Sequence, residues 1–231
     1  MSPLTMTPIA HIRTDFPTRF GIPRQPGLVE GLEGRVVFAP PFRSPEALRG
    51  MEDFSHLWLV WAFSALSSEG WSPTVRPPRL GGNRRMGVFA TRSPFRPNPI
   101  GLSCVQLLRI EPSPEGHILV VAGADLMDGT PILDIKPYLP YTDCHPEATQ
   151  GFTAAGQDYL LEVDIPAPLL ERVPSEKRLP LRGILAQDPR PAYQRDGRSY
   201  GLSFAGLEIS FRVEGTCLHV THITTETAAH L

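Results

Sequence analysis

The sequence has little lysine, few cysteines and no long apolar run. Of its 22 basic residues only Lys136 and Lys177 are lysines; the other 20 are arginines. Its three cysteines lie far apart, in neither a zinc spacing nor a disulfide framework. The longest apolar run is Leu57–Phe63, far short of the roughly 20 residues that cross a bilayer. With no signal-peptide pattern at the start, we expect a reduced cytoplasmic protein without a membrane partner or a metal.

Three common nucleotide and hydrolase motifs are also missing. No G-x-G-x-x-G follows a strand-like run, and the sequence contains neither a P-loop nor G-x-S-x-G. Their absence argues against a Rossmann nucleotide site, a P-loop NTPase and an α/β-hydrolase.

Proline is the residue in excess. The chain of 231 residues has 26 prolines and 20 glycines. The combined share of these two residues is below the roughly 25–30% that marks disordered low-complexity chains. Hydrophobic residues make up 41%, enough to bury a core. Proline costs about 3 kcal/mol in a helix interior, so we expect few long helices.

Short apolar runs bounded by Gly, Pro, Asp or Ser predict a mainly β protein. A brief helix is expected at Ser44–Arg49, with Ser44 as N-cap and Pro45 at the first helical position. Many short strands with few helical turns favour a β-barrel N-terminal domain over residues 1–145. The expected strands are Ile9–Arg13, Arg35–Ala39, His56–Phe63, Met86–Thr91, Ser103–Ile110, His117–Ala122 and Ile132–Lys136.

A polar stretch, Thr142–Gln157, predicts a linker to a second unit. Residues 146–231 then form this linker and a small α+β C-terminal domain. We expect a helix at Leu181–Gln187, and strands at Leu202–Val213 and Cys217–Ile223 joined by Glu214-Gly215-Thr216.

The segment Trp71–Ile110 contains seven arginines and no acidic residue, although the net charge of the chain is only -2. Clustered guanidinium groups suit RNA phosphates. The alternatives are a solvated surface loop, or pairing with carboxylates elsewhere in the fold. Within the segment, three prolines stiffen Arg92–Gly101, which is either a site loop or a structural turn between strands.

Three carboxylates, Asp125, Asp128 and Asp134, lie near one sheet end. They could orient a ligand, act as a base, or neutralise the arginines. The Asp128-Gly129 pair also predicts a hairpin turn.

The run Gly87-Val88-Phe89-Ala90-Thr91-Arg92-Ser93-x-x-Arg96-Pro97-Asn98-Pro99-Ile100-Gly101 resembles the TsaA/TrmO-like family of tRNA methyltransferases. Agreement extends over most of the chain, but Thr142–Pro180 is shorter than in those relatives. The other matching segments are Pro23–Gly27, Phe54–Trp58, Pro77–Asn83, Asp128–Tyr138 and Leu185–Tyr193.

The resemblance implies a β-barrel that uses S-adenosyl-L-methionine to methylate the exocyclic amine of adenine-37 in the tRNA anticodon loop. That base already carries a threonylcarbamoyl group. The family forms homodimers whose interface lies near the cofactor. Relatives often have His where this chain has Ser64. The implied cofactor-binding residues are Pro23, Arg24, Gln25, Phe63, Ser64, Arg92, Leu102, Asp128, Gly129, Thr130 and Pro131.

The lone pair of the target nitrogen is delocalised, so a base would raise its nucleophilicity. We assign Asp128 and Asp134 as base or base-orienter, and Asn98 as a third catalytic candidate that bonds the adenine edge or holds its loop. The expected substrate-binding residues are Arg84, Arg85, Arg96, Lys136 and Tyr138.

Two other functions remain open at this point. One is a non-catalytic S-adenosylmethionine-binding module that recognises RNA or regulates. The other is a methyltransferase for a small metabolite, which would not need the acid-free arginine segment.

Overall fold

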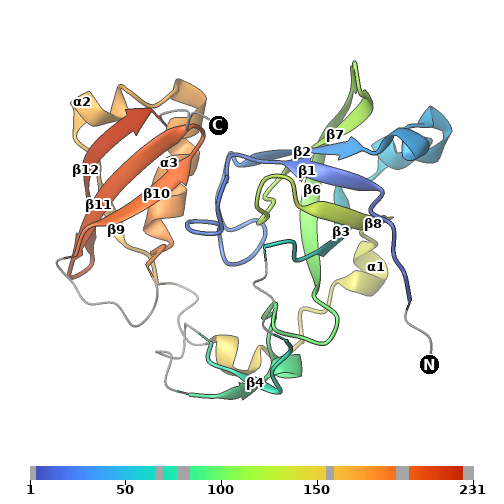
Figure 1. Cartoon of the computed structure of the whole chain (residues 1–231), viewed down its shortest axis with the longest axis horizontal. Helices are drawn as coiled ribbons and strands as arrows, with labels where there is room; N and C mark the ends of the chain where they lie inside the picture. The colour runs from blue at the N-terminus through green and yellow to red at the C-terminus, as the bar shows by residue number, and fades with distance from the viewer. Residues whose placement is uncertain (1–3, 66–69, 78–83, 155–158, 191–197, 226–231) are drawn as a thin grey trace.

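Six strands form a closed barrel in the order β1-β2-β7-β6-β3-β8, with β8 pairing back onto β1 (Figure 1). The structure is a computed structural model and describes residues 4–65, 70–77, 84–154, 159–190 and 198–225. The strands are β1 (Ala10–Arg13), β2 (Glu33–Phe38), β3 (His56–Ala62), β6 (Ile100–Ser113), β7 (Gly116–Ala122) and β8 (Pro131–Pro137).

Alternation of side chains builds the barrel interior. On β3, Leu57, Leu59 and Trp61 are buried, and their antiparallel partners on β6 are Val105, Ser103 and Gly101. Directly opposed residues share one face of a sheet, so these six residues point into the barrel together. The expected mainly β character is confirmed.

A second lobe leaves the barrel between β3 and β6 and lies below it in Figure 1. It holds the two-stranded sheet of β4 (Thr74–Val75) and β5 (Met86–Gly87), then the 3-10 turn η5 (Val88–Ala90). The strand expected over Met86–Thr91 is therefore wrong beyond Gly87, because the chain turns there; Thr91 N–H bonds to the Val88 carbonyl at 3.1 Å.

Short helical turns complete the N-terminal part. They are η1 (Pro40–Phe42), η2 (Pro45–Leu48), η3 (Met51–Asp53) and the one-turn helix α1 (Pro140–Asp143). The turn expected at Ser44–Arg49 is present as η2, but the Ser44 side chain makes no cap bond. Among the described residues, no helix is long and apolar enough to cross a membrane.

The C-terminal part has its own four-stranded sheet, ordered β10-β11-β12-β9, with β9 parallel to β12. The strands are β9 (Glu162–Asp164), β10 (Tyr200–Phe204), β11 (Leu207–Glu214) and β12 (Cys217–Thr225). The linker region contains η6 (Gly151–Ala154), and helices α2 (Ala167–Leu170) and α3 (Ser175–Ala186) accompany the sheet.

Two expectations for this part need correction. The single strand expected over Leu202–Val213 is two strands, because Ala205 and Gly206 adopt φ of 52° and 73° and turn the chain into a hairpin. The helix α3 begins six residues before the expected Leu181 and contains Pro180. The expected pairing of Leu202–Val213 with Cys217–Ile223 is confirmed for the part Leu207–Glu214, which pairs with Cys217–Thr225.

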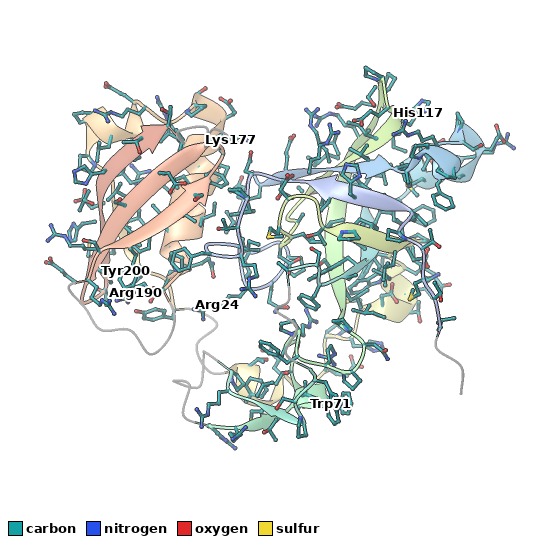
Figure 2. All side chains as sticks on the ribbon, in the orientation of Figure 1. Arg24, Trp71, His117, Lys177, Arg190 and Tyr200 are labelled. Carbon is teal, nitrogen blue, oxygen red and sulfur yellow. The ribbon has the colours of Figure 1, made fainter. Side chains whose placement is uncertain are left out.

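The connection between β1 and β2 packs into the C-terminal core. Phe16, Val29 and Leu32 are buried there with residues of α3 and of the C-terminal sheet. The ring centroids of Phe16 and Phe204 lie 5.4 Å apart. Lys177 of α3, on the side of that unit facing the connection in Figure 2, pairs with Asp15 at 2.5 Å. Residues before β2 thus belong to two cores.

Candidate active site

At one end of the barrel, the Trp61 ring packs closely against Gly101. The two residues oppose each other on β3 and β6, and a Cβ added to Gly101 would lie 2.2 Å from Cε2 of the Trp61 ring. Any side chain at position 101 would displace the indole. The glycine of the motif is therefore required by close packing.

We expect Gly101→Val to lower the free energy of unfolding by about 1–3 kcal/mol, as overpacking of a core does. Urea denaturation would measure it. Gly87→Val is the matched control, since nothing lies within 4 Å of a Cβ built there. Equal losses in the two variants would contradict the packing argument.

The Trp61 indole begins a chain of hydrogen bonds. Its Nε1–H donates to Ser103 Oγ at 3.0 Å, and the Ser103 hydroxyl donates to Asp125 Oδ1 at 2.6 Å. Ser103 is fully buried and points inward two residues along β6 from Gly101. Asp125 follows β7 in the chain.

Asp125 also lies in the electrostatic field of the arginine-rich loop. Burial raises the pKa of its carboxyl group, while the Ser103 hydrogen bond and the positive charge of Arg92 act in the opposite direction. Arg92 in turn donates through Nη1 to Gln25 Oε1. The fold thus brings two of the predicted cofactor residues, Gln25 and Arg92, into contact. A third, Phe63, packs edge-on against Trp61 with ring centroids 4.3 Å apart.

The loop from Arg92 to Gly101 is held by its own residues. Arg96 Nη1 donates to the carbonyls of Thr91 and Ser93 at 2.8 and 3.2 Å. Phe63 N–H bonds to the Pro99 carbonyl at 2.9 Å, which extends the β3–β6 ladder. The Asn98 side chain is exposed. Part of the Arg96 donor capacity is thus used to shape the loop, and its role in substrate binding stays a prediction.

The Asp128–Pro131 turn is fastened to the connection after β1. Asp128 Oδ1 accepts from Thr14 N–H at 2.9 Å, and Asp128 N–H bonds to the Phe16 carbonyl at 2.8 Å. Gly129 has φ of 73° and Thr130 is buried. The expected hairpin is wrong: the turn is tight, but β7 and β8 pair with other strands.

Several predicted residues lie on the outer face of the barrel instead. Leu102 and Asp134 both oppose Val60, on β6 and β8 respectively. Asp134 accepts from Ile135 N–H through Oδ1 and pairs with Lys136 through Oδ2, each at 2.9 Å. Tyr138 packs against Trp58 with ring centroids 5.7 Å apart.

The arginines of the acid-free segment divide into two groups. Arg109 pairs with Glu111 at 2.9 Å and with Glu33 at 3.6 Å. For this arginine, the alternative to RNA binding holds, namely pairing with carboxylates of the fold. Arg84 and Arg85 are exposed on the β4–β5 lobe, where Arg85 Nε bonds to Thr74 Oγ1 at 2.9 Å. Of the motif Pro77–Asn83, the structure describes only Pro77.

The buried Pro23 and exposed Arg24 lie beside the C-terminal part. Arg24 Nη2 donates to the Asp188 carbonyl at 3.2 Å, and a pocket between the two regions is lined by Ile22, Pro23, Gln187 and Asp188 among others. Asp188 also pairs with Arg190 at 2.8 Å; Figure 2 labels Arg24 and Arg190. Ser64, the remaining predicted cofactor residue, is exposed just after β3.

The sequence prediction missed Trp61 and Ser103, and did not select Asp125 as a site residue. The available signal was Ser103 itself, a serine at an inward position between Gly101 and Val105. A buried hydroxyl needs a hydrogen-bond partner, so this serine indicates other polar groups inside the barrel. No cluster of three or more His, Cys, Asp or Glu side chains that could hold a metal ion occurs in the part of the chain that the structure describes.

Comparison with known proteins agrees over both parts. Residues 11–144 match the tRNA-methyltransferase O N-terminal domain, and residues 161–226 match the TrmO C-terminal domain. A protein of Escherichia coli K12 named tRNA (adenine(37)-N6)-methyltransferase is 42% identical over 222 residues, 92% of this chain and 94% of that protein. A Pseudomonas aeruginosa protein named putative S-adenosylmethionine-dependent methyltransferase RcsF is 41% identical over 223 residues, 89% and 90% of the two chains.

Among solved structures, a crystal structure of TrmO from P. aeruginosa superposes with a TM-score of 0.77 at 35% identity. The superposition covers 97% of this chain and 98% of that one.

Proposed function

The chain belongs to the tRNA-methyltransferase O family, and we propose that it transfers a methyl group from S-adenosylmethionine to the exocyclic amine of threonylcarbamoyl-adenosine at tRNA position 37. The observation that carries the proposal is the bond from Arg92 to Gln25. It joins two loops of the family motif at the end of the barrel where Phe63 and Asp125 also lie.

The residues at this end suit S-adenosylmethionine. Arg92 offers a planar fork of donors for a carboxylate, Gln25 offers an amide, and Phe63 an aromatic ring. We propose that they hold the cofactor with Pro23, Arg24, Ser64, Leu102 and the Asp128–Pro131 turn. When bound, the cofactor supplies an electrophilic methyl group on its sulfonium.

The main contribution of the protein is to align the target nitrogen with that methyl group, since correct orientation supplies much of the rate in transfer reactions. A base that removes the proton from the nitrogen adds to it. Of the two predicted carboxylates, Asp128 is the better candidate. Only its Oδ1 has a hydrogen-bond partner among the described residues, whereas both Asp134 oxygens are engaged.

We propose that the tRNA anticodon loop is gripped by exposed cations and an aromatic side chain. Arg84 and Arg85 on the β4–β5 lobe can bind phosphates, and Arg96 or Asn98 can contact the modified base. Lys136 and Tyr138 lie at the far end of β8, and could extend the contact along the barrel.

Methyl transfer to defined tRNA tests the function. The purified protein with labelled S-adenosylmethionine is expected to methylate tRNA that carries threonylcarbamoyl-adenosine at position 37 at least about tenfold faster than the same tRNA without that group. Mass spectrometry of anticodon-loop fragments locates the methyl group. Efficient methylation of unmodified adenosine would contradict the proposed substrate.

The same assay separates the other functions. A binding module would bind S-adenosylmethionine and tRNA without any labelled product. A small-metabolite enzyme would lack salt-sensitive tRNA binding, which many phosphate contacts produce.

We also propose that residues 1–145 form the methyl-transfer domain, that residues 146–231 form the linker and C-terminal domain, and that the protein acts in the cytoplasm as a homodimer. Large exposed apolar side chains such as Phe89 and Leu102, 75% and 51% exposed, support self-association. Light scattering at micromolar concentration measures it.

A further inference from the structure

We propose that the C-terminal part belongs to the methyl-transfer site: it holds the loop Pro23–Gly27 in position, and Asp188 is the positioning residue that fixes Arg24. The inference rests on the proposed function, which places this loop at S-adenosylmethionine. It gives the segment after helix α3, 164 residues further along the chain, a part in cofactor binding.

Both flanks of the loop are built into the C-terminal core. On the N-terminal side, Phe16 is buried in that core, and Phe20 and Ile22 pack against it. On the other side, Val29 and Leu32 are buried in the same core. The chain thus leaves the C-terminal core at Ile22 and re-enters it at Val29, with the loop between these two points.

Two glycines bring these flanks into close contact with the C-terminal part. A Cβ added to Gly21 would lie 2.0 Å from Leu202 Cδ1 on β10. A Cβ added to Gly183 of α3 would lie 2.7 Å from Val29 Cγ1. Packing this close leaves the flanks no room to slide, so the ends of the loop are fixed against β10 and α3.

The loop itself contacts the segment that follows α3. Arg24 Nη2 donates to the Asp188 carbonyl at 3.2 Å. The Gln25 amide donates through Nε2 to the Arg24 carbonyl at 2.6 Å, and its Oε1 accepts from Arg92. Three hydrogen bonds therefore lead from the C-terminal part through the loop to Arg92 of the family motif.

The Asp188 side chain holds its own carbonyl in place. Asp188 adopts a φ of 50°, in the left-handed region that Asp and Asn tolerate better than most residues. Its largely buried carboxylate accepts from Arg190 at both oxygens, from Nε at 2.8 Å and from Nη2 at 3.0 Å. The Arg190 backbone N–H adds a bond to Oδ1 at 3.3 Å. Paired bonds of this kind have a fixed geometry, and they lock the turn that presents the carbonyl to Arg24.

The bond between Arg24 and Asp188 orders the loop more than it stabilises the core. Arg24 is exposed, and an exposed arginine side chain has many rotamers unless a partner restricts them. A binding loop that is already ordered loses less entropy when its ligand binds. Loss of the contact is therefore expected to weaken cofactor binding and to leave the chemical step unchanged.

The test compares Asp188→Ala with Asp188→Asn in the full chain, by calorimetric titration with S-adenosylmethionine. Alanine removes the carboxylate and disfavours the left-handed φ, whereas asparagine tolerates that φ and keeps an Oδ1 that can accept from Arg190. We expect Asp188→Ala to raise the Kd for S-adenosylmethionine about tenfold, the scale of one hydrogen bond to a charged group. Asp188→Asn should restore the wild-type Kd, and kcat at saturating cofactor should be unchanged in both variants.

Two further variants show through which residues Asp188 acts. Arg190→Ala removes the same paired bonds from the other side, and carries the same expectation if Asp188→Ala yields no folded protein. The double variant of Arg24→Ala and Asp188→Ala should bind S-adenosylmethionine no more weakly than Arg24→Ala alone, since Asp188 acts through Arg24.

Arg172→Ala is the matched control for a general effect on the C-terminal part. It also removes a bond from an arginine to a backbone carbonyl, but the partner of Arg172 Nη1 is Ile223 on β12, at 2.9 Å, and not the loop. General destabilisation would reduce the number of folded binding sites in both variants without changing the affinity of the sites that remain. The Kd of Arg172→Ala should therefore equal that of the wild type.

Each outcome has one meaning. Wild-type affinity in Asp188→Ala, an equal loss of affinity in Arg172→Ala, or a further loss in the double variant would each overturn the inference and leave the proposed function intact. A wild-type protein that binds S-adenosylmethionine but transfers no methyl group to tRNA would instead overturn the proposed function, whatever the variants bind.

Discussion

Asp128→Asn is expected to reduce kcat for methylation of modified tRNA by about 10²- to 10⁴-fold, the range that a positioned base contributes. The turn should survive, because the asparagine Oδ1 can still accept from Thr14 N–H as Asp128 Oδ1 does at 2.9 Å. KM for S-adenosylmethionine should change little. Single-turnover transfer of labelled methyl, measured with saturating cofactor, isolates the chemical step.

Asp134→Asn is the matched control for this experiment. It makes the same change on β8, the strand that follows the Asp128 turn. The carboxylate oxygens of Asp134 already bond to Ile135 N–H and Lys136. A small effect there and a large one at Asp128 would assign the base. If Asp134→Asn were the slower enzyme, the assignment to Asp128 would be wrong.

Phe16→Ala is expected to lower the free energy of unfolding by about 3–5 kcal/mol, the usual loss for a buried phenylalanine. Phe16 is 1% exposed and packs in the C-terminal core, although it precedes β2 of the barrel. The same variant should raise KM for S-adenosylmethionine. The Pro23–Gly27 loop continues from Phe16, and the Phe16 carbonyl accepts from Asp128 N–H at 2.8 Å.

Urea denaturation and initial-rate kinetics below the midpoint measure the two effects. Phe42→Ala is the control, since Phe42 lies in η1 and is 38% exposed. A Phe16→Ala protein that lost stability but kept its KM would show that the C-terminal core does not support the cofactor loop.

The strands of the barrel were predictable because burial on one face imposes alternation. Leu57, Leu59 and Trp61 mark β3 in this way, whereas β7 is marked by a continuous buried run, Ile118–Val121. Turns were harder. The Asp128-Gly129 pair correctly indicates a tight turn, but a turn signal does not say whether the flanking strands pair with each other. Ala205-Gly206 carries a weak signal inside an apolar run.

The chemistry can be predicted from local features of the sequence: the arginines without acids, the proline-stiffened loops and the family motif each occupy one continuous segment of the chain. Which of these groups lie close to one another depends on the fold. Gln25, Arg92 and Asp125 lie 67 and 33 residues apart, and their juxtaposition depends on how the barrel closes. Likewise, the β1–β2 connection packs into the C-terminal core because this removes the apolar surface of Phe16 and Val29 from water. No local sequence pattern indicates which of the two cores these side chains enter.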